Sequence, residues 1–323
     1  MAREVNLLRR TRIGAYPYCL AVLEAYAKLA PLWQRSCLFI YTGFGTWLAN
    51  QLGVDMAAVW SRGESVLEEA CVLNNLEPAQ LAKMLRQFSA LRAREEGPLE
   101  FQEAKDTVYE QLYWPLGAHV CFALQPSAFA RQSFVMKVAD SIEKECARVA
   151  DLGCGPGVIL NNLLVHRPGW SAQGLDISRV AVDYAARLAD HKGVGERVRF
   201  STGDLVNLPY RDASFDLVVA SEVLEHVPSI HAALAEIKRV LRPGGKAVIT
   251  VPIESRSALH VHSLKDGDDL ATLCLEAGLA IRRRETRRLP GFGDDWTHFF
   301  LMAVSEADAR HEYANDRPVV TFL

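Results

Sequence analysis

The sequence predicts an α/β protein whose C-terminal part is a doubly wound, seven-stranded, mostly parallel sheet, preceded by a mostly α-helical domain. After about residue 149, apolar strand-like runs alternate with amphipathic helical stretches, which is typical of such a sheet. Residues before about 125 show helical periodicity and almost no β-branched runs. A glycine-rich turn directly follows the first strand-like run. We therefore expect a helical domain at 1–125 and a sheet domain at 126–323.

Seven strand-like runs account for the expected sheet. They are residues 148–152, 171–175, 198–201, 215–220, 246–251, 279–288 and 298–304. Helical periodicity fills most of the intervals, at residues 158–165, 178–191, 230–241 and 268–277. A loop without a helix joins the last two runs, so we expect one of these two strands to be antiparallel.

Composition sets the broad class of the protein. The chain has 323 residues, 50% of them hydrophobic and 23% charged, which is typical of a soluble globular protein and excludes a disordered or collagen-like chain. The formal net charge of −3 gives no electrostatic reason to expect nucleic acid as a partner. Seven cysteines without a CxxC pair indicate free thiols. With neither a secretory signal nor a convincing membrane span, we expect a cytoplasmic protein.

The segment RVADLGCGPGVILNNLL is the most informative part of the chain. A short apolar strand ends at Asp151, the glycines Gly153, Gly155 and Gly157 follow, and a helix then begins. Glycines allow a tight turn whose backbone approaches a ligand, and the helix N-terminus offers free amide groups. The pattern is GxGxG, whereas dinucleotide-binding folds carry GxGxxG. It leaves poor room for a pyrophosphate, which weakens a dehydrogenase interpretation.

Polar residues follow the next three strand-like runs where each run ends. They are Asp176 with Ile177, Asp204 with Leu205, and Ser221 with Glu222. A carboxylate at Asp176 can accept both hydroxyls of a ribose. A carboxylate at Asp204 can accept from an exocyclic adenine amine, beside an apolar wall. All these positions lie at the carboxyl ends of parallel strands, where open α/β sheets bind ligands.

Together, the segments DLGCGPG, GLDIS, GDLVNLPYRDASFDLVVASEVLEHV and KRVLRPGGKAVIT closely resemble the class I S-adenosylmethionine-dependent methyltransferases. The resemblance covers about residues 129–304. It implies a Rossmann-like methyltransferase sheet in the order 3-2-1-4-5-7-6 with the seventh strand antiparallel, and S-adenosylmethionine as the cofactor. The cofactor-binding residues it implies are Asp151, Gly153, Cys154, Gly155, Gly157, Asp176, Ile177, Asp204, Leu205 and Ser221. Cys154 is interpreted as a small packing residue, because methyl transfer needs no covalent enzyme intermediate.

The segment SEVLEHV places Glu222, Glu225 and His226 within one short helical turn after the fourth strand-like run. His260 and His262 follow the fifth run and could add another ligand. Two carboxylates and imidazoles suit a divalent ion, so the expected metal set is Glu222, Glu225, His226 and His262, for Mg²⁺ or Zn²⁺. The E-x-x-E-H pattern resembles that of ubiquinone O-methyltransferases and RNA 3′-terminal 2′-O-methyltransferases. Two alternatives stay open: His226 acts as a general base without a metal, or the cluster is structural.

The methyl group of a sulfonium is already electrophilic, so the enzyme must align a nucleophile and exclude water. We expect methyl transfer to oxygen, with nitrogen or sulfur as alternatives, of a small, partly apolar metabolite, with His226 and Glu222 as catalytic residues. The helical half is expected to cap the site and could form a homodimer. An RNA-end methyltransferase and a non-catalytic cofactor-binding scaffold stay open. The arginine-rich run at residues 282–288 is interpreted as a solvated edge strand, with nucleic-acid binding as the alternative.

Overall fold

The structure is a computed structural model that describes residues 69–77, 80, 126–254, 260–289 and 296–305. The helical domain expected at 1–125 therefore lies almost wholly outside the described residues, as does the C-terminal end of the expected sheet domain. Within the described ranges, no helix is long and apolar enough to cross a membrane.

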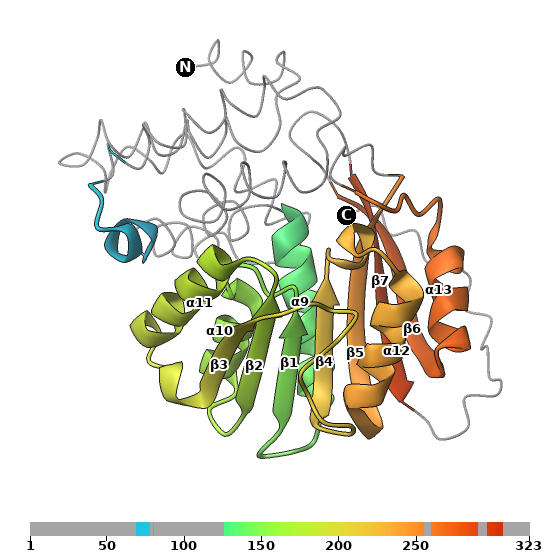
Figure 1. Cartoon of the computed structure of the whole chain (residues 1–323), viewed down its shortest axis with the longest axis horizontal. Helices are drawn as coiled ribbons and strands as arrows, with labels where there is room; N and C mark the ends of the chain where they lie inside the picture. The colour runs from blue at the N-terminus through green and yellow to red at the C-terminus, as the bar shows by residue number, and fades with distance from the viewer. Residues whose placement is uncertain (1–68, 78–79, 81–125, 255–259, 290–295, 306–323) are drawn as a thin grey trace, which may run out of the picture.

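A seven-stranded sheet forms the centre of the described structure (Figure 1), in the order β3-β2-β1-β4-β5-β7-β6. Its strands are β1 Arg148–Leu152, β2 Ser171–Asp176, β3 Val198–Thr202, β4 Phe215–Ser221, β5 Leu241–Ile253, β6 Leu279–Leu289 and β7 Trp296–Ser305. Strands β1 to β5 are parallel, and β7 pairs antiparallel with β5 and β6. The predicted strand order and the antiparallel strand at the end of the chain are confirmed.

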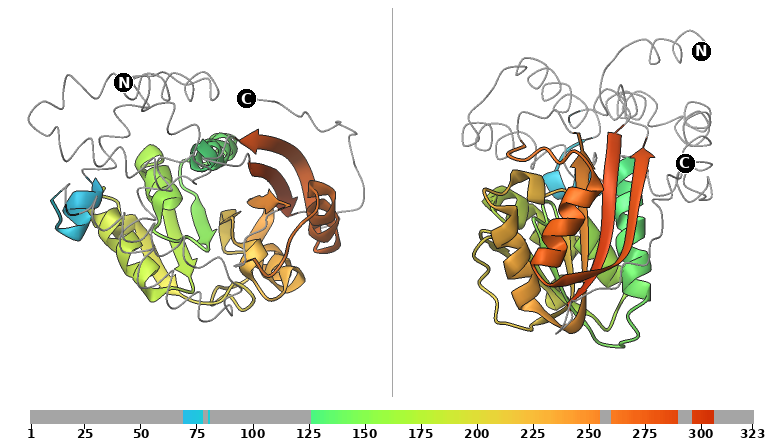
Figure 2. Two further views of the ribbon diagram at one scale, coloured as in Figure 1. Left: turned by 90° about the horizontal axis from the view of Figure 1, so that it is seen from above. Right: turned by 90° about the vertical axis from the view of Figure 1, so that its right-hand side faces the viewer.

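Helices cover both faces of the sheet (Figure 2). They are α9 Pro126–Asp140, α10 Val158–His166 and α11 Arg179–His191 on one face, and α12 Ile230–Val240 and α13 Gly267–Glu276 on the other. A hydrophobic core lies on each face of the sheet, and alternate residues of β4 point into one or the other. Leu217 and Val219 pack with α9 and α10, whereas Val218 and Ala220 pack with α12 and α13. Because both faces are buried, β4 is a continuous apolar run.

Strand β5 is longer than the sequence predicts. We expect it at 246–251, with the preceding RPGG as a turn, but it begins at Leu241 and ends at Ile253. Its N-terminal extension pairs with β4 across a register shift between Phe215 and Leu217. Its C-terminal extension pairs with β7, as far as the Ile253–Thr297 pair. Contacts with neighbouring strands thus extend β5 beyond its apolar run. Helix α9 is a further element that the sequence pattern does not single out.

Strand β6 lies at the edge of the sheet, as expected for the arginine-rich run. Arg283 and Arg287 both pair with Glu285 of the same strand, and Arg284 pairs with Asp268 of α13. Pairing with neighbouring carboxylates offsets much of the local positive charge. These contacts support the edge-strand interpretation.

Candidate active site at the carboxyl ends of the strands

The glycine turn joins β1 to α10 through three residues in the left-handed region. The φ angles are 73° at Gly153, 49° at Gly155 and 71° at Gly157. The N–H of Gly153 donates to the carbonyl oxygen of Leu175 at 2.7 Å, which ties the turn to the end of β2. A Cβ added to Gly153 would lie 2.4 Å from Cγ2 of Val223, so this position has no room for a side chain. The turn is therefore packed directly against the segment that follows β4.

Asp176 locks this turn from the end of β2. The residue is 6% exposed, and each carboxylate oxygen accepts a backbone N–H: Oδ2 from Gly155 at 2.8 Å and Oδ1 from Ser178 at 2.9 Å. Each oxygen retains the capacity for another hydrogen bond, so the expected contact with ribose hydroxyls is compatible with this geometry. The next residue, Ile177, is a large apolar side chain that is 52% exposed at the same edge.

Two buried groups near the turn have strongly shifted pKa values. Burial, and then the nearby Asp176, raise the pKa of the Asp151 carboxyl to about 7. Burial, followed by the charges of Asp176 and Asp151, raises the pKa of the Cys154 thiol well above its usual value. A thiol that stays protonated is a poor nucleophile, which supports the packing role expected for Cys154.

The remaining cofactor candidates lie after β3 and at the end of β4. Asp204 Oδ1 accepts the N–H of Val206 at 3.1 Å, and Leu205 is buried. Ser221 Oγ lies 2.9 Å from Oγ1 of Thr250, which links the ends of β4 and β5. The structure thus places the candidates on both sides of the point where the strand order reverses, between β1 and β4.

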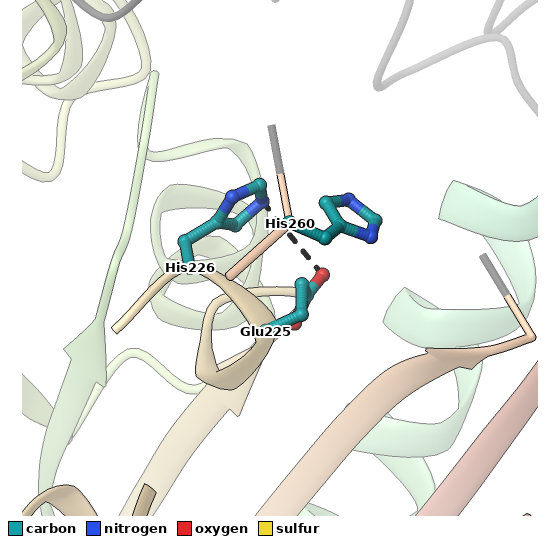
Figure 3. A group of neighbouring side chains, drawn as sticks. All are labelled: Glu225, His226 and His260. Carbon is teal, nitrogen blue, oxygen red and sulfur yellow. Dashed lines mark ion pairs between the residues drawn. The ribbon is translucent and has the colours of Figure 1, made fainter. Parts of the chain in front are cut away.

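A group of Glu225, His226 and His260 forms beside the end of β4 (Figure 3). One ligand atom of each residue lies within 4.8 Å of the others. The rings of His226 and His260 meet edge to face at 4.8 Å, and His226 Nε2 is 3.8 Å from Glu225 Oε1. Glu225 Oε2 and His260 Nδ1 are both buried without a hydrogen-bond partner. Buried polar atoms without partners are unfavourable, so these two mark a place where a ligand or ion can bind.

Two members of this group, Glu225 and His260, have shifted pKa values. Burial, followed by the nearby Glu222, raises the pKa of the Glu225 carboxyl well above its usual value. Burial, followed by the neighbouring His226, lowers the pKa of His260 to about 4. Burial thus favours the uncharged form of both groups.

Glu222, expected among the metal ligands, lies outside this group. Its Oε1 accepts the hydroxyl hydrogen of Thr250 at 2.9 Å, and its Oε2 lies 3.0 Å from His298 Nδ1 and 3.7 Å from Arg131 Nη1. Burial raises the pKa of Glu222, but His298 and Arg131 outweigh it and hold this pKa at about 2. The carboxylate is thus directed to α9, β5 and β7.

His262, the other residue of the expected metal set, also lies outside the group, and His260 takes its place. The carbonyl oxygen of Glu225 accepts the N–H of Val261 at 2.8 Å and that of His262 at 3.1 Å. These two bonds hold the segment that carries His260 against the turn containing Glu225. The His262 ring donates from Nε2 to the carbonyl oxygen of Val227 at 2.9 Å, so this nitrogen is engaged.

Arg131 and His298 are site residues that the sequence motifs do not reveal. They lie on α9 and β7, far from Glu222 in the sequence. His298 is only 2% exposed in a largely apolar strand, and a polar residue in such a run is the one signal that could have marked it. Nothing in the sequence near Arg131 indicates its contact with Glu222.

Comparison with known proteins also finds methyltransferases, the class that the sequence segments resemble. Residues 150–249 match a family described as a methyltransferase domain. The chain is 35% identical over 136 residues to a sterol 24-C-methyltransferase of Gibberella zeae, covering 41% of this chain and 35% of that protein. It is 33% identical over 150 residues to norajmaline N-methyltransferase of Rauvolfia serpentina, covering 43% of this chain and 50% of that protein. The chain thus spans half or less of the length of these two relatives.

Among solved structures, phosphoethanolamine N-methyltransferase 2 of Haemonchus contortus, in complex with S-adenosyl-L-methionine, shares the fold. The TM-score is 0.52 at 17% identity, over 65% of this chain and 61% of that one. The strand order and the glycine turn define a class I S-adenosylmethionine-dependent methyltransferase fold. The described part of the chain from Pro126 onward has this fold, and residues 150–249 match the methyltransferase-domain family.

Proposed function

We propose that the chain is an enzyme that transfers a methyl group from S-adenosylmethionine to an oxygen of a small, partly apolar metabolite, such as a natural product. The observation that carries this proposal is the packing of the cofactor-type glycine turn against the segment bearing the polar group. Val223 fills the space above Gly153, and Glu225 and His226 follow directly in the chain. The names of the two relatives, a sterol and a norajmaline methyltransferase, support a small-molecule acceptor.

The cofactor, when bound, supplies the electrophilic methyl group. The residues around the turn would bind its amino-acid part and its ribose. Asp151 is suited to the cofactor's ammonium group, because a cation nearby favours the ionised carboxylate that burial otherwise disfavours. Asp176 would accept hydrogen bonds from the ribose hydroxyls through the lone pairs that the Gly155 and Ser178 N–H groups leave available.

His226 is the residue to which we assign proton removal from the acceptor hydroxyl. Its side chain is 25% exposed, whereas that of Glu225 is only 3% exposed, so the imidazole is the more accessible group of the cluster. A neutral imidazole can accept a hydroxyl proton at physiological pH. Its neighbours, the buried Glu225 and the half-buried His260, hold the ring in place by packing around it.

The same group fits a divalent cation with nitrogen preference. One carboxylate and two imidazoles make up the ligand set of several catalytic zinc sites, which leave a position open for substrate. Mg²⁺ prefers oxygen ligands, and the displacement of Glu222 to Arg131 and His298 removes one from the expected set. Glu225, His226 and His260 would hold a zinc-type ion, which would polarise the acceptor hydroxyl. This ion is an alternative to the general-base role, because an imidazole whose lone pair binds a metal cannot also accept the hydroxyl proton.

We further propose a cytoplasmic location and a capping role for residues 1–125. The four cysteines that the structure describes, Cys71, Cys146, Cys154 and Cys274, are free thiols, which supports a reducing compartment.

The proposed activity is tested with S-adenosylmethionine carrying a labelled methyl group and a panel of phenols, sterols and amines. The chelator-treated protein is assayed alone and with Zn²⁺ or Mg²⁺. We expect label on a hydroxyl-bearing acceptor and a loss of roughly 100-fold or more in kcat for His226→Asn, the usual contribution of a general base. The matched control is His231→Asn, because His231 is an exposed histidine on α12 that should not affect kcat.

Labelling of amines alone would contradict the oxygen acceptor, and the absence of label on every acceptor would contradict the enzyme. If His226→Asn retains the wild-type kcat, the assignment of His226 as base is wrong.

A further inference from the structure

Glu222 has a backbone conformation that residues other than glycine rarely adopt. Its φ is 55°, in the left-handed region, and it stands between the end of β4 and the turn Leu224–His226. Its N–H donates to the carbonyl oxygen of Thr250 at 2.8 Å. Such conformations persist only where the surrounding structure holds them, and they concentrate at functional sites.

The bend at Glu222 determines the position of both halves of the proposed active site. The next residue, Val223, lies over the glycine turn so closely that a Cβ on Gly153 would be 2.4 Å from its Cγ2. The turn after Val223 carries Glu225 and His226. A relaxation of the backbone at Glu222 would therefore move the cover of the cofactor turn and the acceptor-side group together.

Three elements hold the Glu222 side chain. Thr250 contributes a hydroxyl from β5, His298 a ring nitrogen from β7, and Arg131 a guanidinium from α9. The side chains of Arg131 and His298 are only 5% and 3% exposed, and that of Glu222 is 16% exposed. Removing one partner from such a buried charged group leaves the remaining charge uncompensated, so the carboxylate has a strong preference for this one position.

We propose that Arg131 and His298 are positioning residues of the methyl-transfer site, which act by holding Glu222 and so fixing the bend that places Val223 on the glycine turn. This inference rests on the proposed function, but it concerns two residues that lie outside the sequence motifs of the methyltransferase fold. Arg131 acts through Glu222 and makes no contact of its own with the cofactor. Glu222 is then an anchor of the backbone, in place of the catalytic and metal-binding roles expected for it from the sequence.

The test is a double-mutant cycle on the affinity for S-adenosylhomocysteine, measured by calorimetry on the full chain. The variants are Arg131→Met, Glu222→Gln and the combination. We expect each single variant to weaken binding roughly tenfold, and the combination to bind no more weakly than either single variant, because both changes release the same bend. In the transfer assay, Arg131→Met should also lower kcat, and Arg131→Lys should restore most of the loss.

The matched control is Arg242→Met. Arg242 pairs with the buried Asp216 at 2.6 Å at the amino end of β4, away from the glycine turn. This variant should lose stability without a change in cofactor affinity, which separates positioning from general destabilisation. If Arg131→Met does not fold, Arg131→Gln, which removes the positive charge but stays polar, replaces it with the same expectation.

Multiplicative effects of the two single variants would indicate that Arg131 contacts the cofactor directly and would overturn the inference. Unchanged affinity and kcat in Arg131→Met would overturn it as well. The proposed function fails in a different way, through a wild-type chain that does not bind S-adenosylhomocysteine at all.

Discussion

At the scale of single residues, Asp176 connects the cofactor site to the fold. Its carboxylate accepts the N–H groups of Gly155 and Ser178, so Asp176→Ala removes two charge-assisted hydrogen bonds. It also removes the proposed contact with the ribose. Each such bond contributes roughly 1.5–3 kcal/mol, so we expect the affinity for S-adenosylhomocysteine to fall by roughly 100-fold or more. Calorimetry measures the affinity, and circular dichroism checks that the chain still folds.

The control for this prediction is Asp183→Ala. Asp183 is an exposed acid on α11 that pairs with Arg179 four residues earlier, and its loss should leave binding unchanged. An unaltered dissociation constant in Asp176→Ala would show that the ribose assignment is wrong.

Asp151 gives the protein a pH-dependent stability when no cofactor is bound. Its pKa is about 7 in the folded chain and 3.8 as a free side chain, so the folded state binds more protons between these pH values. Stability therefore falls as pH rises from about 4 through about 7, by up to about 4 kcal/mol for a shift of this size. We expect Asp151→Asn to unfold in urea at a higher concentration than wild type at pH 8, and at a similar one at pH 4.

The exposed Asp183 again provides the reference, because Asp183→Asn should follow the wild type at both pH values. A wild-type stability curve that does not fall between pH 4 and 8, with Asp151→Asn parallel to it, would show that Asp151 is ionised in the folded state without loss of stability.

At the scale of elements, substitutions at two glycines distinguish the energetic cost of backbone strain from that of close packing. Gly153 and Gly193 have φ angles of 73° and 68°, but a Cβ on Gly153 would lie 2.4 Å from Val223, whereas nothing lies within 4 Å of one on Gly193. In Gly193→Ala, the free energy of unfolding should therefore fall only by the cost of the left-handed conformation, about 1–2 kcal/mol. In Gly153→Ala, the free energy of unfolding should fall by roughly 1–3 kcal/mol more, because of overpacking against Val223. This variant should also bind the cofactor more weakly.

Urea unfolding of both variants measures this difference, and titration with S-adenosylhomocysteine measures the second effect. Equal losses of stability, with cofactor affinity retained in Gly153→Ala, would show that Val223 moves aside freely and that the turn needs no close cover.

The elements show which sequence signals suffice and which do not. Strand β4 is predictable because burial on both faces requires a continuous apolar run. The length of β5 is not, because its ends are set by pairing with β4 and β7 and not by its own side chains. The same holds for His260 and His262: both follow β5, and their placement depends on hydrogen bonds to the carbonyl oxygens of Glu225 and Val227, which the sequence pattern does not reveal.

At the scale of the whole molecule, the strand order and the glycine turn were predictable because they depend on a resemblance spread over several segments of the chain. The Arg131–Glu222–His298 contacts were not, since they join α9, the residue that follows β4, and β7, which lie far apart in the sequence. The expected helical domain at 1–125 is not tested by the described residues. Contacts from residues 69–77 do reach α11, where Arg187 donates to the carbonyl oxygen of Leu73 and Glu69 pairs with Lys192 beyond the helix end.

The most direct test of the central claim is calorimetric titration of the purified, chelator-treated full chain with S-adenosylhomocysteine, followed by Zn²⁺. We predict one-site binding with a dissociation constant of roughly 1–100 μM, a free energy of about −5.5 to −8 kcal/mol. Binding should weaken at least about tenfold in Gly153→Ala, in which the added side chain meets Val223. No binding at millimolar ligand, or equal binding by wild type and Gly153→Ala, would contradict a cofactor site at the glycine turn.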